Sequence, residues 1–236
     1  MPTTLAQIET LARLRLVETT ARFWTSAELI GIEAAGCRDL WRDIVDLKAE
    51  HYLKVNDTDV FLGASATELS GVPADIHKVY LIEPRDLTSS SANAGIIFKP
   101  LDFNHRTFQG ARSRSATDPT NDTIYYAITG QGAPVGAPVI RCAPKVSSQL
   151  NVTLSYVPTL GELDSNSIVP VPGEADNALV AWTVAFASAK EREDKSPDPN
   201  WLSVYATEKQ HLLQSLGLRQ LQEPTYAEAV FEEFWL

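Results

Sequence analysis

The chain has 236 residues, of which 44% are hydrophobic and 21% are charged, the balance of an ordinary globular protein. This composition excludes collagen-like, disulfide-scaffold and wholly disordered chains. Its 20 basic and 30 acidic residues give a net charge of −10, and the resulting field repels phosphate, so tight binding to DNA or to an anionic membrane is not expected. Two cysteines, no leader-like N-terminus and no long apolar run predict a soluble protein of a reducing cytoplasm.

The N-terminal fifth of the chain carries helical signals. Thr3 or Thr4 can cap a first helix, and Thr25 with Ser26 can cap a longer second helix. In the second helix the buried stripe is expected to recur at three- and four-residue spacing. It runs through Leu29, Ile30, Glu33, Cys37, Leu40, Trp41, Ile44, Val45 and Lys48.

From about residue 52 the pattern becomes that of strands. Strands are expected at residues 52–55, 60–63, 76–83, 94–99, 123–129, 138–142 and 150–157. The turn at 56–59 predicts that the first two form a hairpin. The last strand alternates clearly and predicts a half-buried antiparallel strand, with one face made of Leu150, Val152, Leu154 and Tyr156. The polar segment 104–121 is expected to be a long loop.

Helical signals return in the last third of the chain. Helices are expected at residues 174–193 and 200–216, with Gly217 as the C-cap of the second. The sequence therefore predicts an α+β fold, in which a helical bundle forms from N- and C-terminal helices and an antiparallel β-rich insertion lies between them. The expected boundaries are 1–51 and 170–217 for the bundle, 52–169 for the insertion and 218–236 for a C-terminal docking tail.

The motifs of common catalytic and metal sites are missing. The four histidines are far apart in sequence, and no zinc, phosphate-loop or serine-nucleophile pattern occurs. The two cysteines, Cys37 and Cys142, are expected to fill the core. We therefore expect no catalytic residue, no metal, no cofactor and no enzyme activity, although a catalytic site can also be assembled from residues distant in sequence.

Two other features favour assembly. The chain ends in a cluster of large apolar side chains, which either fold back onto their own bundle or anchor in a partner protein. This cluster comprises Phe231, Phe234, Trp235 and Leu236. The second feature is a set of three arginines within nine residues of an acidic chain, namely Arg106, Arg112 and Arg114. They form either a solvated loop or a contact with the acidic face of a neighbouring copy or a tail component.

The order of elements resembles that of tailed-bacteriophage head-to-tail adaptor proteins, also called connector or neck proteins. The resemblance extends from about residue 5 to residue 220 and contains no catalytic signature. The matching stretches are WTSAELI (24–30), DLW (39–41), LSGVPADI (69–76), IIFKP (96–100), LSYVP (154–158) and VPGE (171–174).

This resemblance implies a ring, commonly of twelve identical subunits, beneath the portal protein at the capsid vertex. The helical bundle would build the ring, and Phe231, Phe234, Trp235 and Leu236 would dock onto the portal. The β-rich insertion, with Arg106, Arg112 and Arg114, would face a neighbouring subunit or the next neck or tail protein. Genome DNA would pass through the channel without specific binding. The implied location is the head-tail neck of the virion, assembled in the bacterial host cytoplasm.

Three alternatives remain open. A tail terminator or another neck-completion protein would also form a ring but need not dock onto the portal. A small enzyme or carbohydrate-binding domain would show a concave pocket with clustered carboxylates or aromatic rings. A host cytoplasmic regulator would stay monomeric or dimeric and bind no virion component.

Overall fold

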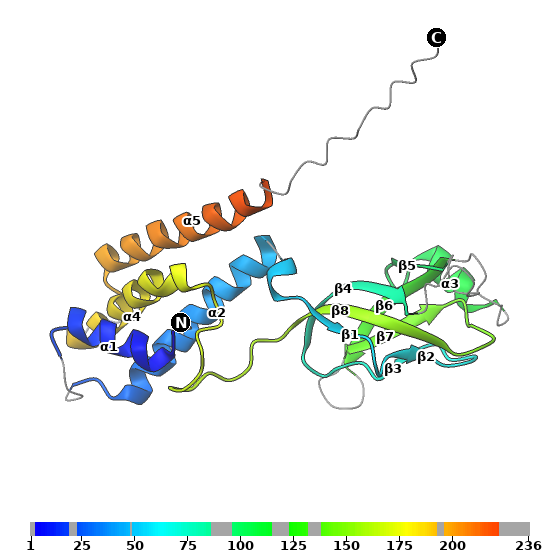
Figure 1. Ribbon diagram of the computed structural model, residues 1–236, viewed down its shortest axis with the longest axis horizontal. Helices are drawn as coiled ribbons and strands as arrows, with labels where there is room; N and C mark the ends of the chain where they lie inside the picture. The colour runs from blue at the N-terminus through cyan, green and yellow to red at the C-terminus, as the bar shows by residue number, and fades with distance from the viewer. Residues whose placement is uncertain are drawn as a thin grey trace, which may run out of the picture. The chain divides into compact units, whose positions relative to one another are not determined.

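The computed structural model describes residues 3–18, 23–47, 49–85, 96–114, 123–131, 138–192 and 196–221. Its helices and two β-sheets make an α+β fold (Figure 1). The chain separates into two compact units: residues 1–48 with 160–236, called the helical unit, and residues 49–159, called the β-unit. Residues 160–169, which the sequence analysis assigned to the insertion, belong to the helical unit. In that unit the backbone N–H of Leu5 donates to the carbonyl of Ser167.

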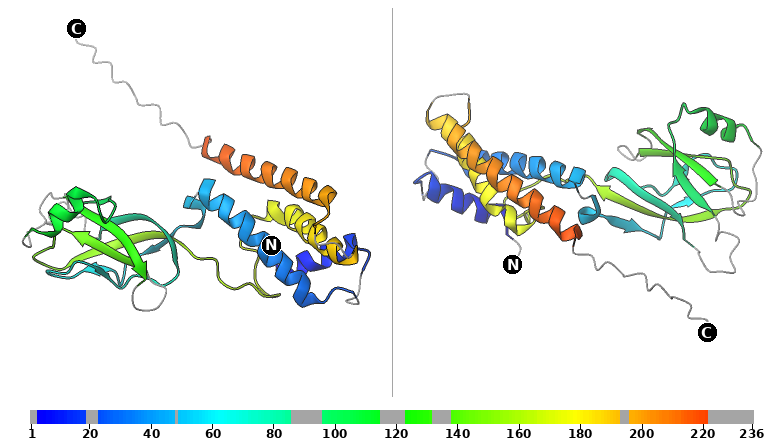
Figure 2. Two further views of the ribbon diagram at one scale, coloured as in Figure 1. Left: turned by 180° about the vertical axis from the view of Figure 1, so that it is seen from behind. Right: turned by 90° about the horizontal axis from the view of Figure 1, so that it is seen from above.

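The helical unit is built around one central helix. Its helices are α1 (Leu5–Arg15), α2 (Ser26–Leu47), α4 (Asp176–Glu191) and α5 (Pro199–Leu221), with a short 3-10 helix, η2 (Gly173–Ala175), before α4. Helix α4 contacts each of the other three, as the views of Figure 2 show. It can do so because small buried residues such as Ala178, Ala181 and Ala185 let neighbouring helices approach it closely.

The ends of these helices test the predicted caps. At the start of α2 the Thr25 N–H donates to Glu28 Oε2 at 2.9 Å, and the Glu28 N–H donates to Thr25 Oγ1 at 3.2 Å. This reciprocal pair is a capping box, which satisfies backbone donors that the first helical turn leaves free. The expected C-cap at Gly217 is wrong, because α5 continues to Leu221. A single glycine lowers helix stability by only about 1 kcal/mol, too little to end a long helix.

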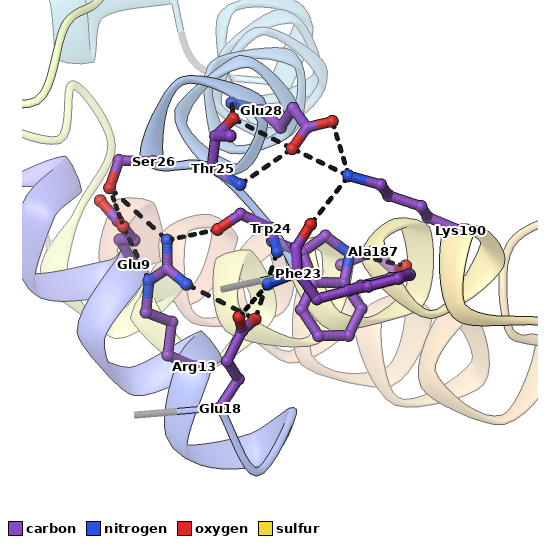
Figure 3. Close-up of polar contacts among 10 residues, drawn as sticks. All are labelled: Glu9, Arg13, Glu18, Phe23, Trp24, Thr25, Ser26, Glu28, Ala187 and Lys190. Atoms are coloured by element: carbon purple, nitrogen blue, oxygen red, sulfur yellow. Dashed lines mark hydrogen bonds and ion pairs between the residues drawn. The ribbon is translucent and has the colours of Figure 1, made fainter. Parts of the chain in front are cut away.

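A buried ionic cluster joins α1 to the start of α2 (Figure 3). Arg13 donates to Glu9 Oε1 at 2.8 Å and to the Trp24 carbonyl at 3.0 Å. Ser26 Oγ donates to the same Glu9 oxygen at 2.7 Å, and Glu18 pairs with Arg13 at 3.6 Å. Charged groups this deeply buried are retained only when partners replace lost water. The cluster therefore fixes the approach of α1 to α2.

The β-unit contains two sheets. The first consists of β1 (Lys54–Asn56), β2 (Phe61–Leu62), β3 (Leu69–Ser70), β4 (Ile76–Pro84) and β8 (Leu150–Pro158), preceded by the 3-10 helix η1 (Ala49–Tyr52). The second consists of β5 (Ile97–Pro100), β6 (Thr123–Gln131) and β7 (Pro138–Ala143). The expected hairpin between the first two strands is wrong, because β1 and β2 both pair with β8. The turn residues 56–59 correctly predicted that the two strands are separate, but they did not predict that both strands pair with β8.

The inner faces of both sheets share one hydrophobic core. The alternation predicted for β8 is confirmed, since Leu150, Val152, Leu154 and Tyr156 are all buried. Facing them from the second sheet are Ile124, Ile140 and other residues of the same cluster. Cys142 also lies in this core, and Cys37 is buried in the helical unit, so the expectation that both cysteines fill cores is confirmed. Burial raises the pKa of each thiol to about 12.

The second sheet departs from the expected antiparallel pattern. Strand β5 pairs with β6 in parallel, and β6 pairs with β7 antiparallel. A parallel pair needs a crossover connection, usually a helix. Here the crossover includes α3 (Arg106–Arg112), whose Phe108 and Ala111 pack against Ala127 and Ala143. The segment predicted as a long loop therefore contains a helix.

Candidate functional site

An open pocket of about 670 Å³ in the β-unit is the candidate site. Its walls come from the middle of β4, the end of β5 with the turn that follows, and β6. The lining combines three aromatic rings with one carboxylate and one imidazole. These are Tyr80, Phe103, Tyr126, Asp102 and His105. Roughly 300–1,000 Å³ is the usual size of a ligand site.

A bulge in β4 provides one wall. Val79 and Tyr80 both line the pocket, although consecutive residues of a regular strand point to opposite faces. The register between β4 and β8 shifts between Val79 and Leu81, so Tyr80 is the extra residue. A bulge of this kind redirects a side chain and is frequent beside binding sites. The Tyr80 hydroxyl donates to Glu50 Oε1 at 2.6 Å, and this bond raises the pKa of Tyr80.

Strand β6 provides the opposite wall. Ile124, Tyr126 and Ile128 share one side of the strand, and the first two are buried in the core. Ile128 is 52% exposed and lines the pocket. Burial raises the pKa of Tyr126, so its hydroxyl stays protonated at neutral pH.

The turn between β5 and α3 forms the floor of the pocket. The Leu101 N–H donates to the Tyr126 carbonyl at 2.9 Å, which ties the turn to β6. The His105 N–H donates to the Asp102 carbonyl at 2.9 Å, and His105 Nδ1 accepts from the Thr107 N–H at 3.2 Å as the N-cap of α3. Asp102 and His105, which both line the pocket, are therefore held in one tight turn.

Two arginines flank the Phe103 ring. The guanidinium carbon of Arg112 lies 5.1 Å from the ring centroid and that of Arg141 lies 5.5 Å from it. Arg141 also pairs with Glu68 at 3.0 Å. Cation–π contacts of this kind hold the ring in place and bring positive charge to the edge of the pocket.

Of the three arginines singled out from the sequence, Arg112 is placed at the pocket by its contact with the Phe103 ring. Arg106 and Arg112 are the first and last residues of α3, and Arg114 follows two residues later. Arg106 and Arg114 are exposed and Arg112 is half-buried. Within the described ranges, none of the three forms an ion pair with a carboxylate. The other predicted set, Phe231, Phe234, Trp235 and Leu236, lies outside the described residues.

Sequence reasoning missed the aromatic lining. Tyr80 and Phe103 come from segments about twenty residues apart, and no local pattern links them. The one available signal was at α3, where His105 can act as an N-cap and Phe108 and Ala111 have the spacing of a helical face. That signal would have identified the crossover helix, although not the pocket.

A second surface of interest lies on α1 in the helical unit. Leu11 and Leu14 are 45% and 58% exposed, and Val17, just after the helix, is 91% exposed. Val17 also has a φ of 57°, a backbone region that β-branched residues rarely adopt. We call these three residues the α1 patch. An apolar patch of this kind in water is typical of a surface that another protein covers.

Comparison with known proteins assigns no family. No protein-family model matches the chain, and no curated protein matches it in sequence. In the described part of the chain, no group of three or more potential metal ligands comes together. None of the helices among those residues combines the length and apolar character that crossing a membrane requires. The pocket offers flat aromatic and apolar surfaces beside Arg112, for which the described part of the chain supplies no carboxylate partner.

Proposed function

We propose that this chain is a structural virion protein, which forms an adaptor ring between the portal vertex of a phage head and the tail. The observation that carries the proposal is the α1 patch of Leu11, Leu14 and Val17. The helical unit is the part to which the adaptor resemblance assigns ring building, and this unit exposes apolar side chains. Covering them with an identical subunit removes apolar surface from water, which favours association by about 25 cal/mol per Å².

A repeated contact between different faces of one subunit closes into a ring when its rotation allows. In the proposed neck, the ring of about twelve copies extends the DNA channel. The net charge of −10 supports passage of the genome without specific binding. Its partners are the portal protein, through Phe231, Phe234, Trp235 and Leu236, and the next neck or tail protein. This role needs no enzyme activity and no cofactor, and its place is the virion neck.

Native mass spectrometry of the chain, alone and mixed with portal protein, tests this proposal. A ring, or a monomer that becomes a ring only with portal, supports it, whereas a stable monomer that ignores portal overturns it. Leu14→Glu places a charge in the α1 patch and should weaken ring assembly. Gln210→Glu, on the exposed face of α5, adds the same charge elsewhere and should leave the ring intact. A ring that forms but never binds portal would instead indicate a tail terminator or another neck-completion protein.

A second candidate function, carbohydrate binding, is favoured by the aromatic lining of the β-unit pocket. Tyr80 and Phe103 could stack on sugar rings while Asp102 accepts hydroxyl hydrogen bonds. A glycan array probed with the purified chain and with Tyr80→Ala tests it. Binding that disappears in the variant would favour this function over the adaptor.

A further inference from the structure

We propose that the β-unit pocket is a binding site for an acidic, aromatic peptide segment, and that its occupant is residues 222–236 of a second copy of this chain. This inference goes beyond the proposed function, because it requires neither a portal nor a phage. It assigns a ligand class to a pocket that the adaptor role does not use.

The pocket presents apolar surface that its own unit leaves uncovered. Ile128 and Tyr80 are 52% and 42% exposed, and both line the pocket together with Phe103. Ile128 lies on the same side of β6 as the buried Ile124 and Tyr126, but is itself exposed. An aromatic side chain placed there would complete the packing of the inward face. The pocket therefore fits flat apolar groups.

The turn and helix beside the pocket carry more positive than negative charge, and on its other side the Glu50 carboxylate bonds Tyr80. The segment 99–114 carries four cationic residues and one carboxylate, Asp102. Arg106, Arg112 and Arg114 have no carboxylate partner among the residues that the structure describes. Arg112 lies against Phe103, so its charge is at the pocket itself. A ligand that combines aromatic rings with negative charges would fit both the apolar surface of the pocket and the positive charge beside it.

The segment 222–236 has this combination of properties. It contains four glutamates and no basic residue. Its aromatic residues are Tyr226, Phe231, Phe234 and Trp235. Two of the glutamates, Glu232 and Glu233, stand directly between Phe231 and Phe234, so charge and ring alternate within six residues. The indole N–H of Trp235 also needs an acceptor when buried, and the Asp102 carboxylate in the pocket is one.

When the segment comes from a second copy, it does not have to reach the pocket of its own chain. Fifteen residues span up to about 50 Å when extended, enough to reach across a subunit boundary. The contact joins two different faces, the C-terminal segment of one copy and the β-unit of the next. It is therefore heterologous and can propagate around a ring. In a neck that contains portal, the portal would compete for the same segment.

Peptide binding provides the first test. A chain truncated after Leu221, with its fold checked by circular dichroism and thermal melting, is titrated against a fluorescent peptide of residues 222–236. We expect saturable binding that weakens as salt is added. Ile128→Glu should weaken it at least about tenfold, because it places a carboxylate in the pocket. Ile97→Glu, at a 56% exposed residue of β5 outside this pocket, should not. No binding to the folded chain, or equal binding to both variants, overturns the proposal.

A complementation experiment tests whether a second copy is the occupant. One partner is the truncated chain, which has the pocket but not the segment; the other is the full chain with Ile128→Glu, which has the segment but not the pocket. Both carry Leu14→Glu, so that the α1 patch does not contribute. We expect the two to form a mixed complex in sedimentation velocity, while neither associates alone. Absence of the mixed complex at concentrations well above the peptide Kd overturns this assignment, whatever the outcome with portal.

Discussion

The indole of Trp182 lies against the backbone of Gly36, so closely that a Cβ at residue 36 would be 2.7 Å from Trp182 Cδ1. The indole N–H donates to the Ile32 carbonyl at 3.0 Å, which holds the ring against α2. Gly36→Ala should therefore lower the free energy of unfolding by about 1–3 kcal/mol, the usual effect of overpacking a core.

A matched control exists on the same helix. Gly31 is exposed, and a Cβ there meets nothing within 4 Å. Gly31→Ala should raise the free energy of unfolding by up to about 1 kcal/mol through helix propensity alone. Urea denaturation of both variants measures the difference. Equal effects of the two substitutions would contradict the close contact between α2 and α4.

Glu33 should make the stability of the helical unit depend on pH. Its side chain is fully buried, and neither carboxylate oxygen has a hydrogen-bond partner among the residues that the structure describes. Burial, reinforced by the nearby Glu9 charge and opposed by Arg13, raises the pKa of Glu33 from 4.5 to about 8. Between these two values the folded state binds more protons than the unfolded state. Stability should therefore fall as pH rises from 4.5 to 8, by up to about 1.4 kcal/mol per pH unit.

Chemical denaturation at a series of pH values measures this slope. Glu33→Gln keeps the shape of the side chain and cannot ionise, so the variant should lose the slope that Glu33 contributes and be more stable than the parent chain at pH 8. Identical slopes for the two proteins would show that the Glu33 carboxyl does not stay protonated in the folded state.

The sequence predicted an element well where a local repeat of apolar residues is enough to define it. The β8 alternation of Leu150, Val152, Leu154 and Tyr156 needs only one inner and one outer face, and the structure has both. The pairing of strands was not predictable in this way. Strands β1 and β2 look like a hairpin locally, yet both pair with β8, almost a hundred residues away. Which strands pair depends on the packing of the whole β-unit, and a local sequence pattern carries no information about that packing.

In the candidate site, too, some residues could be identified from the sequence and others could not. Arg106, Arg112 and Arg114 stand out in the sequence because charge is visible residue by residue. Tyr80 enters the pocket through a bulge, and Ile128 lines it although Ile124 and Tyr126 on the same side of β6 are buried. The aromatic lining of the pocket could therefore not be predicted from the sequence alone.

Gly71 should be among the least replaceable residues of the β-unit. Its φ is +73°, which side chains rarely adopt, and a Cβ would lie 2.0 Å from the Asp59 carbonyl oxygen. Because both backbone strain and a backbone clash would follow, Gly71→Ala should cost at least about 3 kcal/mol or abolish folding. Gly63→Ala is the control, since a Cβ there meets only Ala66 Cβ at 3.5 Å. Thermal melting of the two variants should separate them clearly, and a small, equal change in both would contradict the turn geometry.

The last prediction separates two of the roles proposed for the C-terminal apolar cluster, portal anchoring and packing on its own bundle. If Phe231, Phe234, Trp235 and Leu236 anchor in the portal, replacing all four by alanine should leave the melting temperature within about 1 °C of the parent chain. The same variant should lose at least about tenfold in portal affinity, because aromatic anchors dominate binding energy at interfaces. Val230→Ala truncates a neighbouring apolar residue and should change neither property. Co-sedimentation with portal and differential scanning calorimetry measure the two. A variant that melts several degrees lower and still binds portal would place the cluster on its own helical bundle.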